Sequence, residues 1–160
     1  MKETAKEVMA REFLTVPPEM TIAKAVQVFR QAAQVTGHPV FGLMVTDAEG
    51  RLVGMLSMYD IFLLLRPKHI HIWGEMSDLD LTGIIDAACH RAKAMLVGDM
   101  MTTDLITITP DTHLLHVVDI MIKKHVRRIP VIEDGVLQGI VYISQVFYHL
   151  LNKLTERSED

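Results

Sequence analysis

The chain carries two copies of one motif, and this internal repeat limits its fold more than any other feature of the 160 residues. The segment 14–18 (LTVPP) recurs as 106–110 (ITITP), and the segment 53–56 (VGML) recurs as 138–141 (QGIV). The first pair lies 92 positions apart and the second lies 85 apart, so the first copy holds seven extra residues between these landmarks. A chain of this length can bury two small cores, and the repeat predicts two units of similar fold.

Both copies predict the same order of elements: strand, helix, strand, strand, helix. A proline ends the first strand, and Thr21 or Thr112 then stands where an N-cap would open an amphipathic helix. The elements predicted for the first copy are strands at 14–16, 43–46 and 52–56, and helices from 21 and at 58–65. Those predicted for the second copy are strands at 106–108, 129–132 and 136–141, and helices from 112 and at 144–154. Glycine-containing turns between the later strands are typical of hairpins.

This order predicts an α+β fold of two small units. One copy alone cannot cover both faces of a three-stranded sheet, so we expect the two to pack sheet to sheet. The extra residues of the first copy are expected in a loop near 35–39. Residues 66–97 are not repeated, and helical spacing of apolar residues over 81–96 predicts a long amphipathic helix against one copy or a partner. The polar tail at 155–160 is expected to fray.

Composition excludes several classes of protein. Twenty acidic residues against 16 basic ones give a net charge of −4, which argues against general nucleic-acid binding. The single cysteine, Cys89, excludes a disulfide framework and fits a reducing cytoplasm; its helical apolar setting indicates a small buried hydrophobe. The charged N-terminus and the short apolar runs predict neither export nor a membrane span. His69 and His71 lack the spacing of a metal site, so no metal is predicted.

The sharpest local signal is Ser57 followed by Asp60, at the point where a strand runs directly into a helix. One interpretation is structural: a serine N-cap with an acid in the first turn stabilises a helix start. The other is functional: Asp60 accepts two ribose hydroxyls, while Ser57 and the free amides of the first turn face a polar ligand. The spacing of the two residues allows both.

The second signal is the densest basic run of the chain, 123–130 (KKHVRRIP). Cations are stabilised at a helix C-terminus, so a solvated helix end is the simplest interpretation. Arg127 and Arg128 lie just past that helix, however, and two guanidinium groups at the start of a strand could bind a phosphate or a carboxylate. A nucleic-acid patch is disfavoured because the run holds no aromatic residue for base stacking.

Taken together, the duplication, the segment 53–61 (VGMLSMYDI) and the segment 127–132 (RRIPVI) resemble a tandem pair of cystathionine-β-synthase-type (CBS) domains, also called a Bateman module. The resemblance covers residues 5–65 and 98–154. It implies a first CBS unit at 1–65, a helical insert at 66–97, a second CBS unit at 98–154 with pseudo-two-fold symmetry to the first, and a polar tail at 155–160.

The family resemblance also implies a ligand. Such pairs bind adenosine compounds, commonly AMP, ADP, ATP or S-adenosylmethionine, in clefts between the copies. Carried over, Asp60 would hold ribose, and Ser57 would hold ribose or the first phosphate. The residues implied for the rest of the ligand are Met55 and Ile106 at the adenine, and Arg127 and Arg128 at the phosphates.

The mirror-image cleft departs from this pattern. Tyr142 and Gln145 replace the serine and the aspartate, and an offset of 85 aligns Arg127 and Arg128 with Gly42 and Leu43. The sequence therefore predicts one competent nucleotide site and one degenerate site, which is empty or holds a less charged molecule.

The sequence thus predicts a cytoplasmic regulatory module that is not an enzyme and has no obligatory cofactor. We expect it to signal through a conformational or dimer change, as a homodimer that acts on an unidentified protein partner. The alternative is a protein-interaction module with vestigial nucleotide sites that docks through the 66–97 insert. An enzyme is disfavoured because no paired carboxylates, Ser/His/Asp order or Walker-type loop is present.

Overall fold

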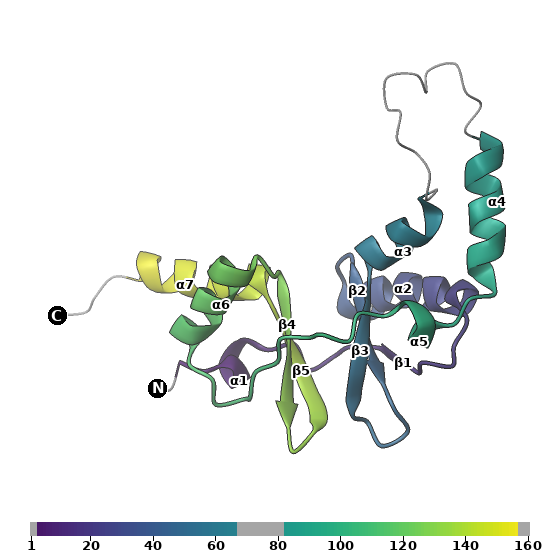
Figure 1. The fold of residues 1–160 in the computed structure, drawn as a ribbon. Helices are drawn as coiled ribbons and strands as arrows, with labels where there is room; N and C mark the ends of the chain where they lie inside the picture. The colour runs from purple at the N-terminus through teal and green to yellow at the C-terminus, as the bar shows by residue number, and fades with distance from the viewer. Residues whose placement is uncertain (1–2, 67–81, 157–160) are drawn as a thin grey trace. The chain divides into compact units, whose positions relative to one another are not determined.

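The computed structural model describes residues 3–66 and 82–156, which fall into two compact units. The first unit comprises the described residues of Leu14–Ala48 and Val53–Asp104. The second comprises those of Met1–Phe13, Glu49–Leu52 and Leu105–Asp160. Each unit is built on a small sheet with helices around it, as the ribbon in Figure 1 shows. The predicted α+β architecture is therefore confirmed.

The first unit holds a three-stranded sheet in the order β1-β2-β3, with β1 parallel to β2. Its elements are β1 (Thr15–Val16), α2 (Ile22–Thr36), β2 (Gly42–Thr46), β3 (Leu52–Ser57), α3 (Met58–Leu65), α4 (Thr82–Lys93) and α5 (Val97–Met100). Thr21 caps α2 as predicted, since its side chain accepts a hydrogen bond from the Lys24 amide. The buried core includes Val16, Leu43, Val45 and Leu56, and Val97 joins it from α5.

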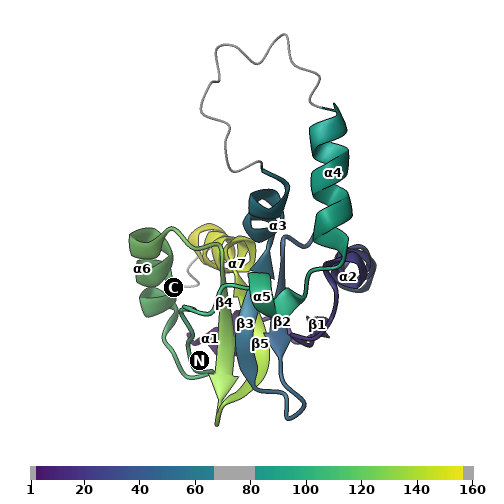
Figure 2. The same ribbon diagram turned by 45° about the vertical axis from the view of Figure 1, so that its right-hand side comes forward.

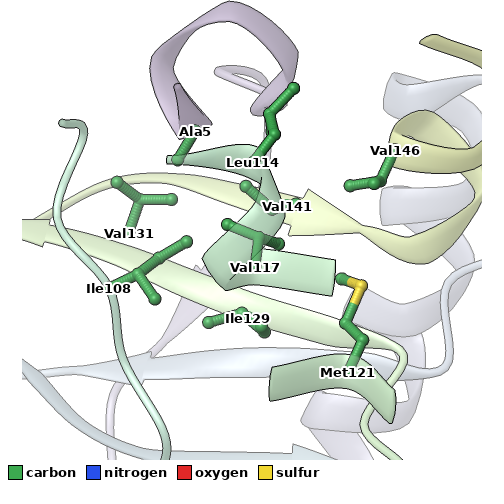
Figure 3. Close-up of a cluster of buried hydrophobic side chains, with 9 residues drawn as sticks. All are labelled: Ala5, Ile108, Leu114, Val117, Met121, Ile129, Val131, Val141 and Val146. Atoms are coloured by element: carbon green, nitrogen blue, oxygen red, sulfur yellow. The ribbon is translucent and has the colours of Figure 1, made fainter. Parts of the chain in front are cut away.

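The second unit holds a two-stranded antiparallel sheet. Its elements are α1 (Ala5–Val8), α6 (Leu114–Lys124), β4 (Arg128–Glu133), β5 (Val136–Tyr142) and α7 (Ile143–Thr155). Asp134 and Gly135 join the strands with φ angles of 52° and 80°, the paired positive values of a two-residue type I′ turn. Figure 3 shows the core, where Ala5 of α1 lies among side chains of α6, β4, β5 and α7.

The short segment that opens each copy docks on the core of the other copy. We call residues 5–10 the first leader and residues 97–102 the second leader. In the first leader, the Ala5 amide donates to the Thr112 carbonyl at 2.8 Å, and the Lys6 amide donates to Pro110 at 3.0 Å. Figure 1 shows α1, drawn in purple, beside the green and yellow elements of the second unit.

The second leader repeats these contacts in the first unit. The Val97 and Gly98 amides donate to the carbonyls of Met20 and Pro18, both at 2.8 Å, and Figure 2 shows α5 beside β3. Every partner lies 92 positions from its counterpart in the other unit. The repeated prolines of the LTVPP and ITITP segments thus provide one of the two carbonyls that bind each leader. The compact units consequently differ from the sequence repeats proposed at 1–65 and 98–154.

The repeated glycine of each copy is explained by the same docking. The leader residue Ala10 exchanges two backbone hydrogen bonds with Ile140, at 2.8 and 3.0 Å, directly beside Gly139. Thr102 does the same with Met55, at 2.9 Å in both directions, beside Gly54. A Cβ at Gly139 would lie 2.8 Å from the Ala10 carbonyl oxygen, and one at Gly54 would lie 3.0 Å from that of Thr102. Only glycine lets the leader approach this closely.

One predicted strand is shorter than expected. The segment 106–108 forms a single parallel bridge, Ile108 with Val131, whereas β1 pairs two residues with β2. Pro130 stands in β4 where Met44 stands in β2. Because proline has no N–H to donate, the parallel ladder cannot extend by the further residue that β1 has.

Helix boundaries in the repeats also differ from the predictions. The N-cap of α6 is His113 rather than Thr112, and its Nδ1 accepts from the Leu115 amide at 3.1 Å. The extra residues of the first copy do not form only a loop at 35–39, because α2 has 15 residues and α6 has 11. The longer helix ends at Gly37, which caps it with φ 76°.

The insert contributes a helix to the first unit. Helix α4 packs on α3 and α2, and its Ala88 and Ala92 are buried. It ends at Lys93, earlier than the apolar pattern predicts, because Met95 and Leu96 leave the helix to lead into the second leader. The Met95 carbonyl there accepts from the Ile22 amide at 2.8 Å. Residues 67–81, including His69 and His71, and residues 157–160 of the predicted polar tail lie outside the described residues.

A charged contact joins Glu3, two residues before the first leader, to α7. Glu3 accepts from His149 Nε2 at 2.8 Å and from Lys153 Nζ at 2.6 Å. The hydrogen bonds from Lys153 and His149 lower the pKa of Glu3 below its ordinary 4.5, and the bond from Lys153 has the larger effect. Burial acts in the opposite direction. The same carboxylate raises the pKa of Lys153 above 10.5.

These shifts make the contribution of the contact to stability depend on pH. The contribution of the Glu3–Lys153 ion pair is fully present between pH 4.5 and 10.5. It is lost as the pH falls through the lowered pKa of Glu3, and it is lost again as the pH rises through the raised pKa of Lys153. We expect Glu3→Gln to lower the free energy of unfolding near neutral pH, with a difference from the parent that disappears in acid. Urea unfolding across this range measures it, with exposed Glu7→Gln as the control. A difference that is constant with pH would contradict this assignment.

Candidate functional site

The start of α3 holds Ser57 and Asp60 in a reciprocal capping box. The Asp60 amide donates to Ser57 Oγ at 3.3 Å, and the Ser57 amide donates to Asp60 Oδ2 at 2.7 Å. Ser57 Oγ also donates to Asp60 Oδ2 at 3.0 Å. The structural interpretation of this motif is therefore correct. It leaves the functional one open, because the capping box does not use all the lone pairs of the carboxylate.

A third group reaches Asp60 from the second leader. Thr102 Oγ1 donates to Asp60 Oδ1 at 3.2 Å, although the two residues are 42 positions apart. Asp60 is 8% exposed, and its carboxylate thus accepts two hydrogen bonds at Oδ2 and one at Oδ1. A carboxylate offers about four acceptor sites, so one remains on Oδ1.

The hydroxyl of Ser57 is restricted in the same way. Its proton is donated to Asp60, so its oxygen has one lone pair left and no proton to offer another group. The unused hydrogen-bonding positions of Ser57 and Asp60 are therefore both acceptors. Such a pair suits two hydroxyl donors, as in the cis-diol of a ribose, and it does not suit a phosphate, whose oxygens also accept. Of the two roles expected for Ser57, the geometry favours ribose over the first phosphate.

Arg127 immediately precedes β4, and Arg128 is the first residue of that strand. Arg127 is exposed, and its carbonyl accepts from the Ile143 amide at 2.8 Å. Arg128 is half-buried and pairs with Tyr142 across the sheet; burial lowers the pKa of Arg128, and burial raises that of Tyr142. Within residues 3–66 and 82–156, neither guanidinium forms an ion pair with an acidic side chain. Two adjacent cations without a carboxylate partner can bind an anion.

The six residues predicted to bind the ligand divide between the two units. Met55, Ser57 and Asp60 lie in the first unit, where Met55 is half-buried on β3 and pairs with Thr102. Ile106, Arg127 and Arg128 lie in the second, where Ile106 is half-buried before β4. The structure thus brings Ser57 and Asp60 into direct contact, whereas Arg127 and Arg128 are neighbours because they are consecutive in the sequence. That the two groups share one ligand remains a proposal.

The counterparts in the other copy lack these groups. Tyr142 forms no side-chain cap at the start of α7, and Gln145 Oε1 is buried without a hydrogen-bond partner among the described residues. The predicted alignment of the arginines with Gly42 and Leu43 is wrong by one residue. The Met58 amide donates to Phe41 as the Ile143 amide donates to Arg127. Phe41 and Gly42 are therefore the counterparts, because the hairpin of the second copy is one residue shorter. Neither is a cation.

Among the described residues, Thr102 is the one at this site that the sequence analysis missed. Nothing local marks it, because it is an exposed threonine in a segment without regular structure. The offset of 92 could have identified it, since it aligns Thr102 with Ala10 in the first leader. The exchange of leaders was needed to predict what either residue would contact.

The remaining questions from the sequence concern a metal site, Cys89 and a membrane span. Among residues 3–66 and 82–156, no group of three or more His, Cys, Asp or Glu side chains is placed to hold a metal ion. Cys89 is half-buried on α4, which fits a packing role. Within the same ranges, none of the helices has the length and apolar character needed to cross a bilayer.

The duplicated α+β unit, with an exchanged leader in each copy, defines a tandem pair of small domains of one kind. Residues 5–66 and 97–152 match the CBS domain family, and the chain belongs to it. The predicted identification as a tandem CBS pair is thereby confirmed. An uncharacterised 17.7 kDa protein of Acidianus ambivalens is 27% identical over 153 residues, which are 95% of this chain and 76% of that protein. The chain spans 58% of the longer chloroplastic CBSX1 of Arabidopsis thaliana, at 24% identity.

Solved structures share the fold. The CBS-pair protein CBSX2 from Arabidopsis thaliana matches with a TM-score of 0.74 and 22% identity, over 98% of this chain and all of that chain. CBSX2 in complex with AMP matches with a TM-score of 0.69. The cytosolic domain of the Mg²⁺ channel MgtE in complex with ATP matches with a TM-score of 0.68 and 23% identity, over 92% of this chain and 48% of that chain.

Proposed function

We propose that this CBS pair is a cytoplasmic regulatory module that binds an adenosine compound between its two copies and is not an enzyme. The candidates are AMP, ADP, ATP and S-adenosylmethionine. Asp60 is the observation that carries the proposal. It is a buried carboxylate at a helix start, fixed by three hydrogen bonds and left with one acceptor site for a ligand.

The arginine pair supports a phosphorylated ligand. A half-buried guanidinium is costly to desolvate unless an anion approaches it, and among the described residues no acidic side chain pairs with Arg127 or Arg128. A nucleotide would present ribose hydroxyls to Ser57 and Asp60 and its phosphates to the two arginines. Met55 and Ile106 would contact the adenine. The complexes of CBSX2 with AMP and of the MgtE cytosolic domain with ATP, two proteins that share this fold, support the proposal.

The counterpart residues of the other copy would not bind a nucleotide in the same way. They are Gln145 in place of the carboxylate, and Phe41 and Gly42 in place of the arginines. We therefore expect one nucleotide per chain, with the second position empty or occupied by a less charged molecule.

Signalling would pass through assembly with a second copy and then to a protein partner. Two helices that follow the hairpins carry exposed aromatic residues: Tyr59 and Phe62 on α3, at 68% and 54% exposure, and Phe147 and Tyr148 on α7, at 58% and 61%. Exposed apolar side chains gathered on a helix are typical of interaction surfaces. A ligand that prefers one arrangement of the copies would shift the population of dimers by its difference in affinity.

A ligand panel tests the proposal. Nucleotide-free protein is titrated with adenosine, AMP, ADP, ATP, S-adenosylmethionine and GTP, and followed by thermal unfolding and sedimentation. A ligand at a hundredfold excess over its dissociation constant adds about 2.7 kcal/mol to the free energy of unfolding. We expect an adenosine compound to raise the midpoint and GTP not to.

Charge variants separate phosphate binding from nonspecific attraction. Arg127→Gln is expected to weaken nucleotide binding by about tenfold while leaving adenosine unaffected. Lys123→Gln removes the same charge from the same basic run and is expected to change neither. If no ligand in the panel binds, the proposal is wrong and a protein-interaction module that docks through the 66–97 insert becomes the better explanation.

A further inference from the structure

Thr102 approaches Asp60 because its leader pairs with β3. Its backbone exchanges two hydrogen bonds of 2.9 Å with Met55, and Gly54 leaves room for this pairing. Its hydroxyl then donates to Asp60 Oδ1 at 3.2 Å. The contact joins two segments of the same unit, so it belongs to a single compact part of the chain.

The fold itself does not need this hydroxyl. In the second unit Ala10 occupies the position of Thr102, and its backbone pairs with Ile140 at 2.8 and 3.0 Å without any side-chain hydroxyl. Gln145 occupies the position of Asp60 there, and its buried Oε1 has no hydrogen-bond partner in the described part of the chain. The backbone pairing of a leader with its strand therefore also forms where the residue is alanine. The hydroxyl occurs in the copy that has the carboxylate.

We infer that Thr102 is a positioning residue for ribose recognition, an inference that rests on the function proposed above. Its hydroxyl occupies one acceptor site of Asp60 Oδ1, while Ser57 occupies both sites of Oδ2. The carboxylate is thereby held from both ends and presents one remaining acceptor site in a fixed direction. Without the Thr102 hydroxyl, Oδ1 has two free acceptor sites, and the carboxylate loses a contact that opposes its rotation. Asp60 would then discriminate less between a ribose and a deoxyribose.

Substitution of the hydroxyl tests this role. Thr102→Val keeps the branched shape and removes the donor, Thr102→Ser restores the donor, and Thr103→Val removes the neighbouring exposed hydroxyl as a control. Calorimetric titration with AMP, ATP and their 2′-deoxy and 3′-deoxy forms measures both affinity and ribose preference. We expect Thr102→Val to weaken binding of the ribonucleotide by about three- to tenfold and to reduce the ribose-to-deoxyribose ratio by a similar factor. Thr102→Ser should restore both, and Thr103→Val should change neither.

The possible results distinguish a failure of the proposed function from a failure of the role assigned to Thr102. If the parent protein binds no nucleotide, the proposed function is wrong and this inference falls with it. If the parent binds and Thr102→Val keeps the same affinity and the same ribose preference, the function stands and Thr102 has no positioning role. A lower thermal midpoint with an unchanged ribose preference would likewise assign Thr102 to stability alone and overturn the inference.

Discussion

Replacing Gly139 with alanine is expected to lower the free energy of unfolding by about 1–3 kcal/mol. The new Cβ would lie 2.8 Å from the Ala10 carbonyl oxygen and 2.9 Å from Met9 Sδ. The methionine side chain can move, but the carbonyl belongs to the backbone of the first leader. The leader would have to retreat, which would break its two hydrogen bonds with Ile140 and loosen the packing of Ala5 in the core.

The direction of the stability change distinguishes an effect of leader docking from the intrinsic helix preference of alanine over glycine. Gly83, near the start of α4, has no atom within 4 Å of the position of a Cβ. The same substitution there should raise stability by about 0.5–1 kcal/mol, because alanine favours a helix. Urea unfolding with an unchanged m-value measures both variants. Equal stability of Gly139→Ala and the parent would show that the leader does not hold this position in solution.

Replacing Asp60 with asparagine is expected to weaken nucleotide binding by about 10- to 100-fold. One charged hydrogen bond contributes about 1.5–3 kcal/mol, and this range corresponds to those factors. Asparagine has nearly the same size, but its amide removes the negative charge and presents a donor toward either Ser57 or Thr102, both of which already donate. Titration calorimetry at a temperature where the variant is folded measures the loss.

Asp60 also caps α3, so the variant needs a control that loses a cap without touching the site. Thr21→Ala removes the cap of α2, which costs about 1 kcal/mol, and it should leave the affinity unchanged. If both variants bind equally weakly, the loss reflects stability. If Asp60→Asn binds as well as the parent, the carboxylate is only a helix cap.

Local sequence patterns were sufficient to predict most of the helices and strands. Helix α3 begins and ends at the predicted residues, 58 and 65, because a serine cap, an acid three positions later and an apolar run are all signals within one turn or two. The hairpins followed from alternating strands and glycine turns for the same reason. Pro130 shows the limit of such patterns, since the strand it shortens lies more than 20 residues earlier and depends on a bond that proline cannot donate.

The sequence by itself determined the duplication, the α+β class and the pairing of Ser57 with Asp60, because each depends on spacing along the chain. Tertiary structure alone decided which core receives each leader. Both cores offer the same prolyl carbonyl and the same glycine, so no local pattern distinguishes them. That choice brings Thr102 rather than Ala10 to Asp60, across 42 residues. This long-range contact depends on the tertiary packing of the second leader against β3. It gives the Asp60 carboxylate, which caps α3, a third hydrogen bond that fixes its orientation.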